Sequence, residues 1–487
     1  MQVGVAAMML LAIWAGKAWP QEAGASRPLT LFHTNDWHGT IAPTPALWMG
    51  VADPPLVGGP GLLATLLRQR KFATLAGGGR YLLVDAGDRF QGAPVVNLSR
   101  GRLMTELYNL LGYTLVALGN HDFDYDLAGL RAAQQGARFP LLCTNLRLAT
   151  ASASLWRASA IAPIGGWRVG FVAAMTEDLP RITFPRNIDG VRLEPVIPAL
   201  RREVARLREK GCDLVVLLSH CGHPYDLLLA VAVPGLDVIL GGHSQDQLDQ
   251  PRQINGVWIV QTRGYGSHLG EMTIYSGPGG KGIGRLEYRS HLLEAGRLRS
   301  DPAVDELFAS ATAALRSVTE RSAGTLPEPL LRNANGRPSF AAVIARAVAR
   351  QSGVPIGVFH CGGVRSDLPA GPLTIGQVLT ALPFDHVVVT GELSGADLAA
   401  AFHRGTSLGS LAWAGLEQDP TGQIRLESGA ALEPSQRYRV AFNDFLAQGG
   451  DGFVEFTRAT GARDPSGLVR EAFLAYLAAG LPAPPHP

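Results

Sequence analysis

The sequence predicts a two-domain protein whose first domain is a layered α/β structure, and three observations support this fold class. The chain has 487 residues, more than the length at which a single hydrophobic core usually divides. Several short apolar runs are each followed at once by Gly, His, Asp or Asn, which is typical of strands buried on both faces. Helical patterns lie between some of these runs, as expected of an α/β domain.

The composition excludes several classes of protein. Apolar residues make up 46% of the chain and charged residues 17%, which is too apolar for a disordered protein. Four cysteines are too few for a disulfide scaffold, and they show no CxxC pairing. The 43 basic and 41 acidic side chains give a net charge of +2, so we expect no nucleic-acid partner.

The amino terminus predicts export. Residues 1–15 are apolar, Lys17 carries the first side-chain charge, Pro20 ends the stretch, and Ala23-Gly24-Ala25 follows the small-x-small pattern of a signal-peptidase site. We expect a signal peptide over residues 1–25 and a periplasmic or secreted protein; an uncleaved anchor and a buried helix are the alternatives. No later segment has about 18 uninterrupted apolar residues, so we expect no membrane association after signal cleavage.

The first domain is expected over residues 26–295. A helix between Pro198 and Lys210 has apolar residues at i, i+4 and i+7 and ends at Gly211, where a C-terminal cap belongs. The predicted strands are Leu29–His33, Tyr81–Asp85, Thr114–Leu118, Asp213–Ser219 and Asp237–Leu240.

A connecting segment over residues 296–329 and a second domain over residues 330–487 complete the expected organisation. Asp301-Pro302 has the form of a helix start, which predicts a helix over residues 301–320, and Gly324–Pro329 is a candidate hinge. The second domain should contain a helix over Pro338–Ser352, a capping box of Thr374 and Gln377 before another helix, strands over 387–393 and 438–442, and a helix at Gly395–His403.

Polar side chains follow the predicted strands of the first domain. In an open α/β sheet, the residues just past the carboxyl ends of the strands converge on one crevice. Carboxylates and imidazoles that converge in this way cost desolvation and repulsion unless a cation neutralises them. The residues so placed are Asp36, His38, Asp85, Asp88, Asn120, His121, His220, His223, His243 and Gln245.

These donor types suit a borderline dication such as zinc or manganese better than calcium. Two dications against two carboxylates leave a charge of (+4) − 2 = +2, which would attract a phosphate, and a metal-bound water would be acidic enough to act as a nucleophile. Each motif alone is compatible with an ordinary turn or cap, Asp85 suits a supporting role, and His223 remains open. The donor count supports Asp36, His38 and Gln245 for one ion, Asn120, His220 and His243 for the other, and Asp88 between them.

The blocks HTNDWH, DAGDRFQG, GNHDFD, LSHCGH and GGHSQ resemble the 5′-nucleotidase family of calcineurin-like metallophosphoesterases, in particular the periplasmic UDP-sugar hydrolase/5′-nucleotidase type. The resemblance implies a four-layer α/β/β/α metallophosphoesterase domain followed by a smaller α/β 5′-nucleotidase C-terminal domain. It implies two divalent metal ions (Zn, Mn or Co) that share Asp88, and a catalytic pair of His121 and Asp124. Domain rotation is expected in such a protein, with residues 296–330 as the hinge candidate.

The second domain would bind the substrate. Two aromatic faces can clamp a base by stacking, although a core role is the more ordinary interpretation of such residues when the resemblance is set aside. The family usually has asparagine at the positions of His360 and His386, which puts base preference in doubt. By resemblance, the base would lie between Phe384 and Phe445, the ribose would contact Asp451, and the phosphate would contact Arg365 and, in a looser alignment, Arg332.

The predicted function is an exported dimetal hydrolase that removes phosphate from nucleoside 5′-monophosphates and that also has UDP-sugars in its range. A cyclic-nucleotide phosphodiesterase or a dinucleotide pyrophosphatase on the same scaffold is the alternative. A thiosulfohydrolase is more distant, because Gln245 and the two phenylalanines argue against it. A nucleotide-binding protein without turnover is disfavoured, because both His121 and Asp124 are present.

Overall fold

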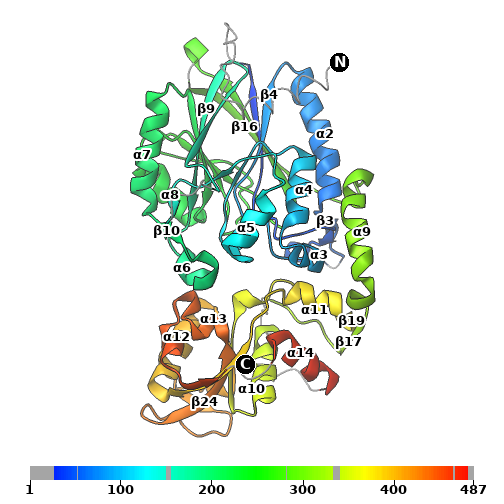
Figure 1. Cartoon of the computed structure of the whole chain (residues 1–487), viewed down its shortest axis with the longest axis vertical. Coiled ribbons are helices and arrows are strands. Elements are labelled where there is room, and N and C mark those ends of the chain that lie inside the picture. Colours follow the sequence, from blue (N-terminus) through cyan, green and yellow to red (C-terminus); the bar gives the residue numbers. More distant parts are fainter. Residues whose placement is uncertain are drawn as a thin grey trace. The chain divides into compact units, whose positions relative to one another are not determined.

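The computed structural model describes residues 27–480, except residues 52, 150–154, 281, 333–339 and 464–466. These residues form two compact units: the first extends to residue 310 without residues 92–95, and the second comprises residues 92–95 and 311 onward (Figure 1). The predicted signal peptide lies outside the described residues. No helix among the described residues combines the length and the apolar character that a membrane crossing requires.

Two six-stranded sheets form the centre of the first unit. In each sheet four neighbouring strands are parallel, and the remaining strands at one or both edges are antiparallel. One sheet has the order β16 (Ile283–Leu292), β15 (His268–Ser276), β1 (Leu29–Thr34), β4 (Arg80–Asp85), β5 (Leu115–Ala117) and β6 (Leu141–Leu142). The other has the order β13 (Arg252–Ile254), β14 (Val257–Gln261), β12 (Val238–Gly241), β11 (Leu214–His220), β9 (Trp167–Met175) and β8 (Ser159–Ile164).

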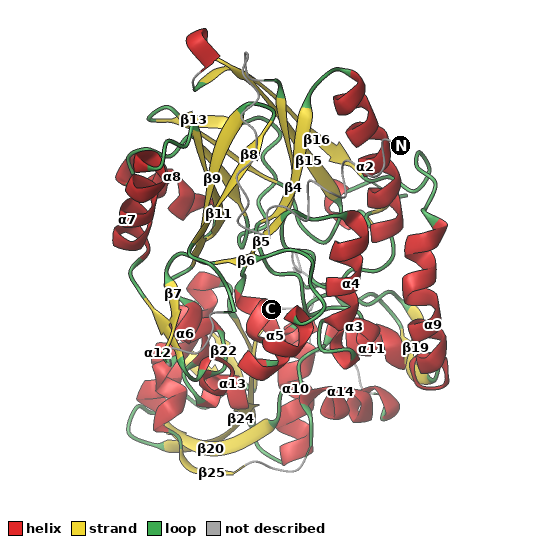
Figure 2. Cartoon of the chain, turned by 45° about the horizontal axis from the view of Figure 1, so that its top comes forward, coloured by secondary structure: helices red, strands yellow, loops and turns green. Residues whose placement is uncertain are grey.

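The two sheets pack face to face, and helices cover their outer faces. Alternate residues of a strand point to opposite faces. On β11, Val216 and Leu218 therefore join a core that also contains Leu31 of β1, whereas Val215 and Leu217 pack with α7 (Val196–Glu209) and α8 (His223–Ala232). Helices α2 (Pro60–Ala76) and α4 (Arg102–Leu111) lie on the opposite side of the unit (Figures 1 and 2). This is the predicted four-layer α/β/β/α arrangement.

Smaller elements complete the first part of the chain. The short helices are α3 (Pro94–Leu98), α5 (Asp126–Gln134) and α6 (Leu179–Ile182), with 3-10 helices at Leu47–Met49, Asn120–Phe123, Pro185–Ile188 and Pro278–Gly280. Two small ribbons pair β2 (Thr44–Pro45) with β3 (Leu56–Val57) and β7 (Leu146–Leu148) with β10 (Val191–Leu193).

The second unit is a smaller α/β domain built on a five-stranded mixed sheet. Helices α10 (Phe340–Ser352) and α14 (Val469–Ala478) pack into one core, and α12 (Gly395–Leu408) packs into another. The sheet order is β21 (Leu411–Ala414), β18 (Ile356–His360), β24 (Arg437–Asn443), β20 (Val388–Ser394) and β25 (Thr460–Arg463). The remaining elements are α11 (Ile375–Ala381), α13 (Asp444–Ala447), the ribbon of β22 (Leu416–Gln418) and β23 (Ile424–Leu426), and 3-10 helices at Cys361–Gly363, Gly450–Gly452 and Val454–Arg458.

The segment between the units differs from the sequence expectation in one respect. The expected helix is present as α9 (Pro302–Thr319), and the division between the units falls within it. The first three residues of the stretch expected as a hinge, 324–326, belong instead to a strand, β17 (Ser322–Leu326), which pairs with β19 (Gly371–Thr374). Gly324 has a φ of 128° and lies at a register shift, so it accommodates an irregularity within the strand instead of ending it.

Two local predictions concern caps and cysteines. The side chain of Thr374 accepts a hydrogen bond from the backbone N–H of Gln377, whose side chain accepts one from Thr374 in return, so the predicted capping box is present. All four cysteines lie within the described residues, and all four are free thiols.

Candidate metal centre and active site

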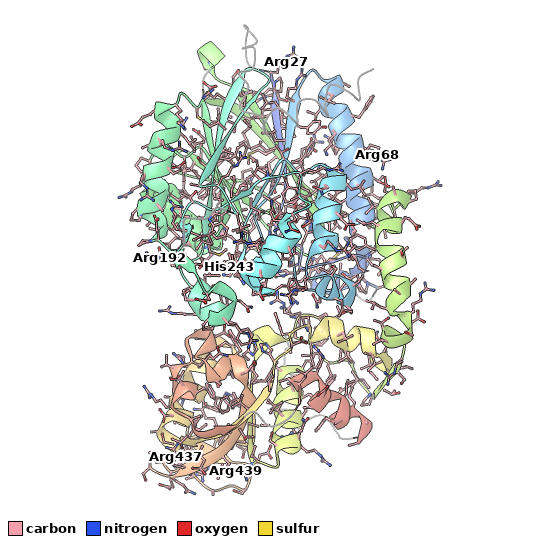
Figure 3. All side chains as sticks on the ribbon, viewed as in Figure 1. Arg27, Arg68, Arg192, His243, Arg437 and Arg439 are labelled. Carbon is pink, nitrogen blue, oxygen red and sulfur yellow. The ribbon has the colours of Figure 1, made fainter. Side chains whose placement is uncertain are left out.

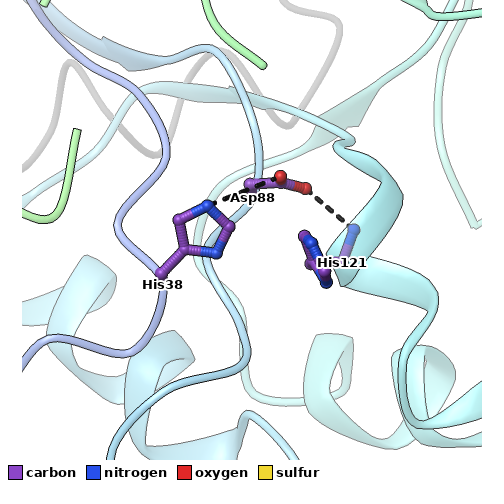
Figure 4. A group of neighbouring side chains, drawn as sticks. All are labelled: His38, Asp88 and His121. Atoms are coloured by element: carbon purple, nitrogen blue, oxygen red, sulfur yellow. Dashed lines mark hydrogen bonds and ion pairs between the residues drawn. The ribbon is translucent and has the colours of Figure 1, made fainter. Parts of the chain in front are cut away.

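The polar residues that follow the strands of both sheets gather around one carboxylate, that of Asp88. Its Oδ2 lies 3.2 Å from Nε2 of His220 and 3.8 Å from Nε2 of His38, and its Oδ1 accepts a hydrogen bond of 2.8 Å from the backbone N–H of His121. Figure 4 shows His38 and His121 on either side of this carboxylate. Residues that are far apart in sequence therefore meet where the parallel strands end, as the sequence predicts.

Two groups of potential metal ligands share Asp88. Its carboxylate forms one group with His38 and His121 and another with His220 and His243, and in each group the ligand atoms lie within 4.8 Å of one another. The predicted amide ligands lie beside these groups: Gln245 Nε2 is 2.9 Å from His38 Nε2, and Asn120 Oδ1 is 3.2 Å from His220 Nε2. His243 lies in the first unit, where Figure 3 labels it.

Asp36 belongs to the same cluster. Its carboxylate lies 3.9 Å from His38 Nε2, and it accepts hydrogen bonds from the backbone N–H of His243 at 2.9 Å and from Asn35 Nδ2 at 2.7 Å. Burial raises the pKa of Asp36 to about 6, against the opposing effects of His220 and of these hydrogen bonds.

The electrostatics of the cluster fit a bound cation. Burial by itself raises the pKa of Asp88, but the imidazoles of His220, His121 and His38 outweigh it and hold that pKa well below its usual range. Burial would lower the pKa of His220, but Asp88 and Asp36 raise it to about 10. Two buried carboxylates thus demand positive charge, which protonated His220 or a divalent cation can supply. Imidazole, carboxylate and amide oxygen suit a first-row dication.

The backbone at the cluster is unusual. A positive φ is uncommon for residues other than glycine and stores strain of about 1–3 kcal/mol at each position, typically at functional sites. Five of the seven predicted metal ligands have this conformation, with φ of 51° at Asp36, 45° at His38, 59° at Asp88, 74° at His243 and 58° at Gln245. The surrounding packing therefore holds these loops in conformations that direct their side chains to one point.

The predicted catalytic pair is formed beside the cluster. Nδ1 of His121 lies 2.8 Å from Oδ2 of Asp124, and the two side chains keep 14% and 18% of their surface exposed. The ring of His121 meets the ring of His38 edge-on, with centroids 5.1 Å apart. His121 is therefore more accessible than the residues around Asp88 and is tied to a carboxylate that orients its ring.

Asp85 and His223 lie outside the two ligand groups. Asp85 is fully buried and accepts hydrogen bonds from Thr34 Oγ1 at 2.6 Å and from the backbone N–H of Gly87 at 2.9 Å, which is the supporting role expected for it. His223 begins α8, and its backbone N–H donates to Ser244 Oγ.

Sequence reasoning missed several supporting residues. Asn35 lies within the quoted motif HTNDWH and joins two loops, because its Nδ2 donates both to Asp36 and to the carbonyl oxygen of Thr262. In the amide orientation that satisfies both its oxygen and its nitrogen, the side-chain oxygen of Gln261 accepts hydrogen bonds from the backbone N–H groups of Gln245 and Asp246. Asn35 could have been found from its place between predicted ligands, whereas nothing local distinguishes Gln261.

In the second unit, the predicted stacking residues belong to one aromatic cluster. The rings of Phe384 and His386 lie 5.2 Å apart, those of His386 and Phe445 6.0 Å, and those of His360 and Phe445 4.8 Å. His386 Nδ1 lies 3.2 Å from the carboxylate of Asp444. The two histidines that depart from the family pattern thus lie between and beside the two phenylalanines.

The other predicted substrate residues occupy loops. Arg365 lies near His360, whose pKa is held well below its usual range by burial and by the nearby His386 and Arg365. Asp451 is exposed, in a left-handed conformation between two glycines. For Arg332, the structure gives a backbone hydrogen bond of 2.6 Å to the carboxylate of Asp367.

Comparison with known proteins agrees with this architecture. Residues 29–247 match the calcineurin-like phosphoesterase family, and residues 322–458 match the 5′-nucleotidase C-terminal domain. Protein UshA of Yersinia enterocolitica is 26% identical over 91% of this chain and 89% of its own, and a 5′-nucleotidase of Vibrio cholerae is 26% identical over 95% and 92%.

Solved structures agree as well. A 5′-nucleotidase precursor from Thermus thermophilus is 27% identical, with a TM-score of 0.84 over 93% of this chain and 96% of that one. The sulfate thiohydrolase SoxB of the same organism, at 20% identity and a TM-score of 0.80, shares the fold. The chain contains both domains in this order, and its alignments cover nearly the whole length of these relatives. It therefore belongs to the 5′-nucleotidase family of calcineurin-like phosphoesterases, which are phosphoester hydrolases.

Proposed function

We propose that this chain is an exported dimetal hydrolase that removes phosphate from nucleoside 5′-monophosphates. The observation that carries the proposal is the carboxylate of Asp88, which two groups of potential metal ligands share beside the pair of His121 and Asp124. A shared carboxylate can bridge two neighbouring dications, and two-metal sites serve phosphoryl transfer. Relatives named 5′-nucleotidase, aligned over most of both chains, support the nucleotide substrate.

The seven predicted metal ligands would hold two dications. When bound, these ions would polarise the phosphoryl group and lower the pKa of water. Asp36, His38, Asp88 and Gln245 would hold one, and Asp88, Asn120, His220 and His243 the other. The cations are zinc, manganese or cobalt in this proposal, in keeping with the donor set.

His121 and Asp124 would handle charge and protons. The Nδ1–H of His121 donates to Asp124 Oδ2 at 2.8 Å, which leaves Nε2 for the substrate. From there the imidazolium would stabilise charge on the phosphoryl oxygens or protonate the nucleoside oxygen as it leaves, and the carboxylate of Asp124 would stabilise the positive ring.

Substrate recognition is assigned to the second unit. Phe384 and Phe445 would stack on the base, Asp451 would accept hydrogen bonds from the ribose, and Arg365, with Arg332, would bind phosphate. The cluster of His360 and His386 with both phenylalanines supports an aromatic binding surface at this place. Base preference would then depend on the two histidines.

Phosphate release from AMP tests the proposal. The purified protein, loaded with Mn²⁺ or Co²⁺, should release phosphate, and a chelator should abolish the release. UDP-glucose, NAD and cyclic nucleotides, tested in parallel, separate the proposal from the pyrophosphatase and phosphodiesterase alternatives. AMP binding without turnover would instead support a non-catalytic protein. For export, intact-mass measurement of periplasmic protein should place the mature amino terminus near Ser26.

A further inference from the structure

The loop that follows β14 carries Arg263 and is tied to the segment that carries Asp36 and His38. Thr262 is buried and holds this loop to Asn35, because its Oγ1 and its backbone N–H both donate to Asn35 Oδ1. Three residues on, the backbone N–H of Tyr265 donates to the carbonyl oxygen of Asp36 at 2.6 Å. The loop is therefore fixed at two points to the segment that carries two predicted metal ligands, Asp36 and His38.

The conformation of this loop is constrained further. Gly264, Tyr265 and Gly266 all have positive φ, at 85°, 51° and 56°. The ring of Tyr265 lies against the ring of His38, with centroids 5.0 Å apart. Arg263, between buried Thr262 and Gly264, thus belongs to a loop that is held against the cluster.

Arg263 lacks an anionic partner within the described residues. Its guanidinium lies over the indole of Trp48, with Cζ 4.3 Å from the ring centroid, and the described part of the chain offers it neither a hydrogen bond nor an ion pair with a carboxylate. Burial lowers its pKa from the usual value, which the nearby Tyr265 only partly opposes. Partial desolvation of a cation without a counter-charge is unfavourable, and such a cation binds an incoming anion well.

The form of the contact favours a phosphate as that anion. Stacking on Trp48 occupies one face of the guanidinium and leaves its N–H edges to donate in the plane, which matches the oxygens of a phosphoryl group. Trp48 itself is 41% exposed, so its ring also remains accessible to a flat group.

We propose that Arg263 and Trp48 form an accessory phosphoryl-binding site of the first unit, which favours substrates that carry a second phosphoryl group next to the one attacked, such as nucleoside diphosphates and nucleotide sugars. The inference rests on the proposed function, because it takes the cluster around Asp88 as the place of phosphoryl attack. It adds a residue pair that selects between substrates with one and two phosphoryl groups.

The test compares substrates that differ in phosphoryl number. With Mn²⁺-loaded protein, Arg263→Gln should lower kcat/KM for ADP and UDP-glucose by about 10-fold or more, because a charge-assisted hydrogen bond is lost. The kcat/KM for p-nitrophenyl phosphate should change by less than about 2-fold. For ADP and UDP-glucose, the kcat/KM of Arg263→Lys should lie between those of wild type and Arg263→Gln. Trp48→Ala should act in the same direction as Arg263→Gln, and Trp48→Phe should be milder.

The control is Arg252→Gln, which removes an exposed arginine of β13. This variant should leave kcat/KM unchanged for all of these substrates. Equal effects of Arg263→Gln on substrates with one and with two phosphoryl groups would overturn the inference, and so would a wild type that hydrolyses AMP but neither ADP nor UDP-glucose.

A binding measurement separates failure of this inference from failure of the proposed function. The non-hydrolysable α,β-methylene analogue of ADP, titrated calorimetrically into Mn²⁺-loaded protein, should bind Arg263→Gln about 10-fold more weakly than wild type. That loss in a protein that hydrolyses none of the substrates would support the accessory site while refuting the hydrolase. Unchanged affinity would refute the accessory site even in an active enzyme.

Discussion

Arg89 and Asp122 form an ion pair in which both side chains are fully buried, with Nε of Arg89 3.0 Å from Oδ1 of Asp122. The other carboxylate oxygen accepts a hydrogen bond of 2.8 Å from the backbone N–H of Gly119. The guanidinium also lies over the ring of Phe90 at 4.5 Å. Because Arg89 follows Asp88 and Asp122 follows His121, the pair ties the loop after β4 to the turn that carries the predicted catalytic histidine.

Removal of this arginine should cost both stability and activity. Arg89→Met leaves the carboxylate of Asp122 buried without its cation, and we expect unfolding in urea to show a loss of about 3–5 kcal/mol. Phosphate release should fall with it. Arg181→Met, which removes an exposed pair with Asp178, is the control and should change stability by less than about 1 kcal/mol. A variant as stable as wild type would show that the buried pair does not hold these loops together.

Replacement of Asp88 should affect both metal sites at once. Asp88→Asn removes the negative charge that both ligand groups share, so elemental analysis should find both ions depleted. Asp85→Asn is the matched control, because Asp85 is buried three residues earlier and contacts Thr34 and Gly87. It should retain both ions. Normal occupancy of both sites in Asp88→Asn would argue against bridging.

His121 should act in catalysis and not as a ligand. His121→Ala should lower kcat by about 10²–10⁴-fold while the protein keeps both metal ions, since proton transfer by a positioned side chain contributes about that much. Asp124→Asn should cause a smaller loss, because the ring remains but loses its orienting carboxylate. His121 lies within ligand distance of Asp88 and His38, so elemental analysis is decisive. Loss of one ion from His121→Ala would reassign it as a ligand.

Phe384 should select for nucleotides over simple phosphate esters. Stacking on an aromatic ring contributes about 1–3 kcal/mol per base, so Phe384→Ala should raise KM for AMP by about 10-fold and leave p-nitrophenyl phosphate almost unaffected. Phe384 is half-buried, whereas Phe445 is 7% exposed and packs against His360. Phe445→Ala should therefore also lower the melting temperature. Equal effects on both substrates would indicate that the phenylalanines serve the core.

Glu271 should make stability depend on pH. It accepts two hydrogen bonds from Arg70, at 2.7 and 2.8 Å, and lies 2.7 Å from His291. Burial by itself raises the pKa of Glu271, but His291 and Arg70 outweigh it and lower the pKa from 4.5 to about 2. Because the pKa of Glu271 is lower in the folded than in the unfolded protein, its ionised form stabilises the fold at pH values above the pKa of the unfolded state. This contribution disappears as the pH falls from about 4.5 through 2.

The measurement for Glu271 is urea unfolding at several pH values. Glu271→Gln should lose about 2 kcal/mol at pH 7 and progressively less as the pH falls toward 2. Glu287→Gln, which removes an exposed pair with Arg285, is the control and should show no such trend. A difference between Glu271→Gln and wild type that does not change with pH would contradict the ion-pair explanation.

Several elements of both units follow from local sequence. The apolar run LVVLLS forms β11, and the helix expected between Pro198 and Lys210 is α7. The capping box of Thr374 and Gln377 forms as predicted, because a cap involves only neighbours along the chain. The prediction from sequence is wrong at Gly324, because this glycine, which suggests a hinge, lies in a paired strand. Local sequence does not show this pairing, since the partner strand is about 50 residues away.

The amino-acid sequence by itself determined which donors follow the strands, because a buried parallel strand needs a continuous apolar run and its polar residues can come only at the end. The tertiary structure alone decided what holds those donors: the buried pair of Arg89 and Asp122, the bridge from Asn35 to Thr262, and the positive φ of the loops. Each of these depends on groups that are distant in the chain. Only the packing of the complete domain compensates for their desolvation and backbone strain.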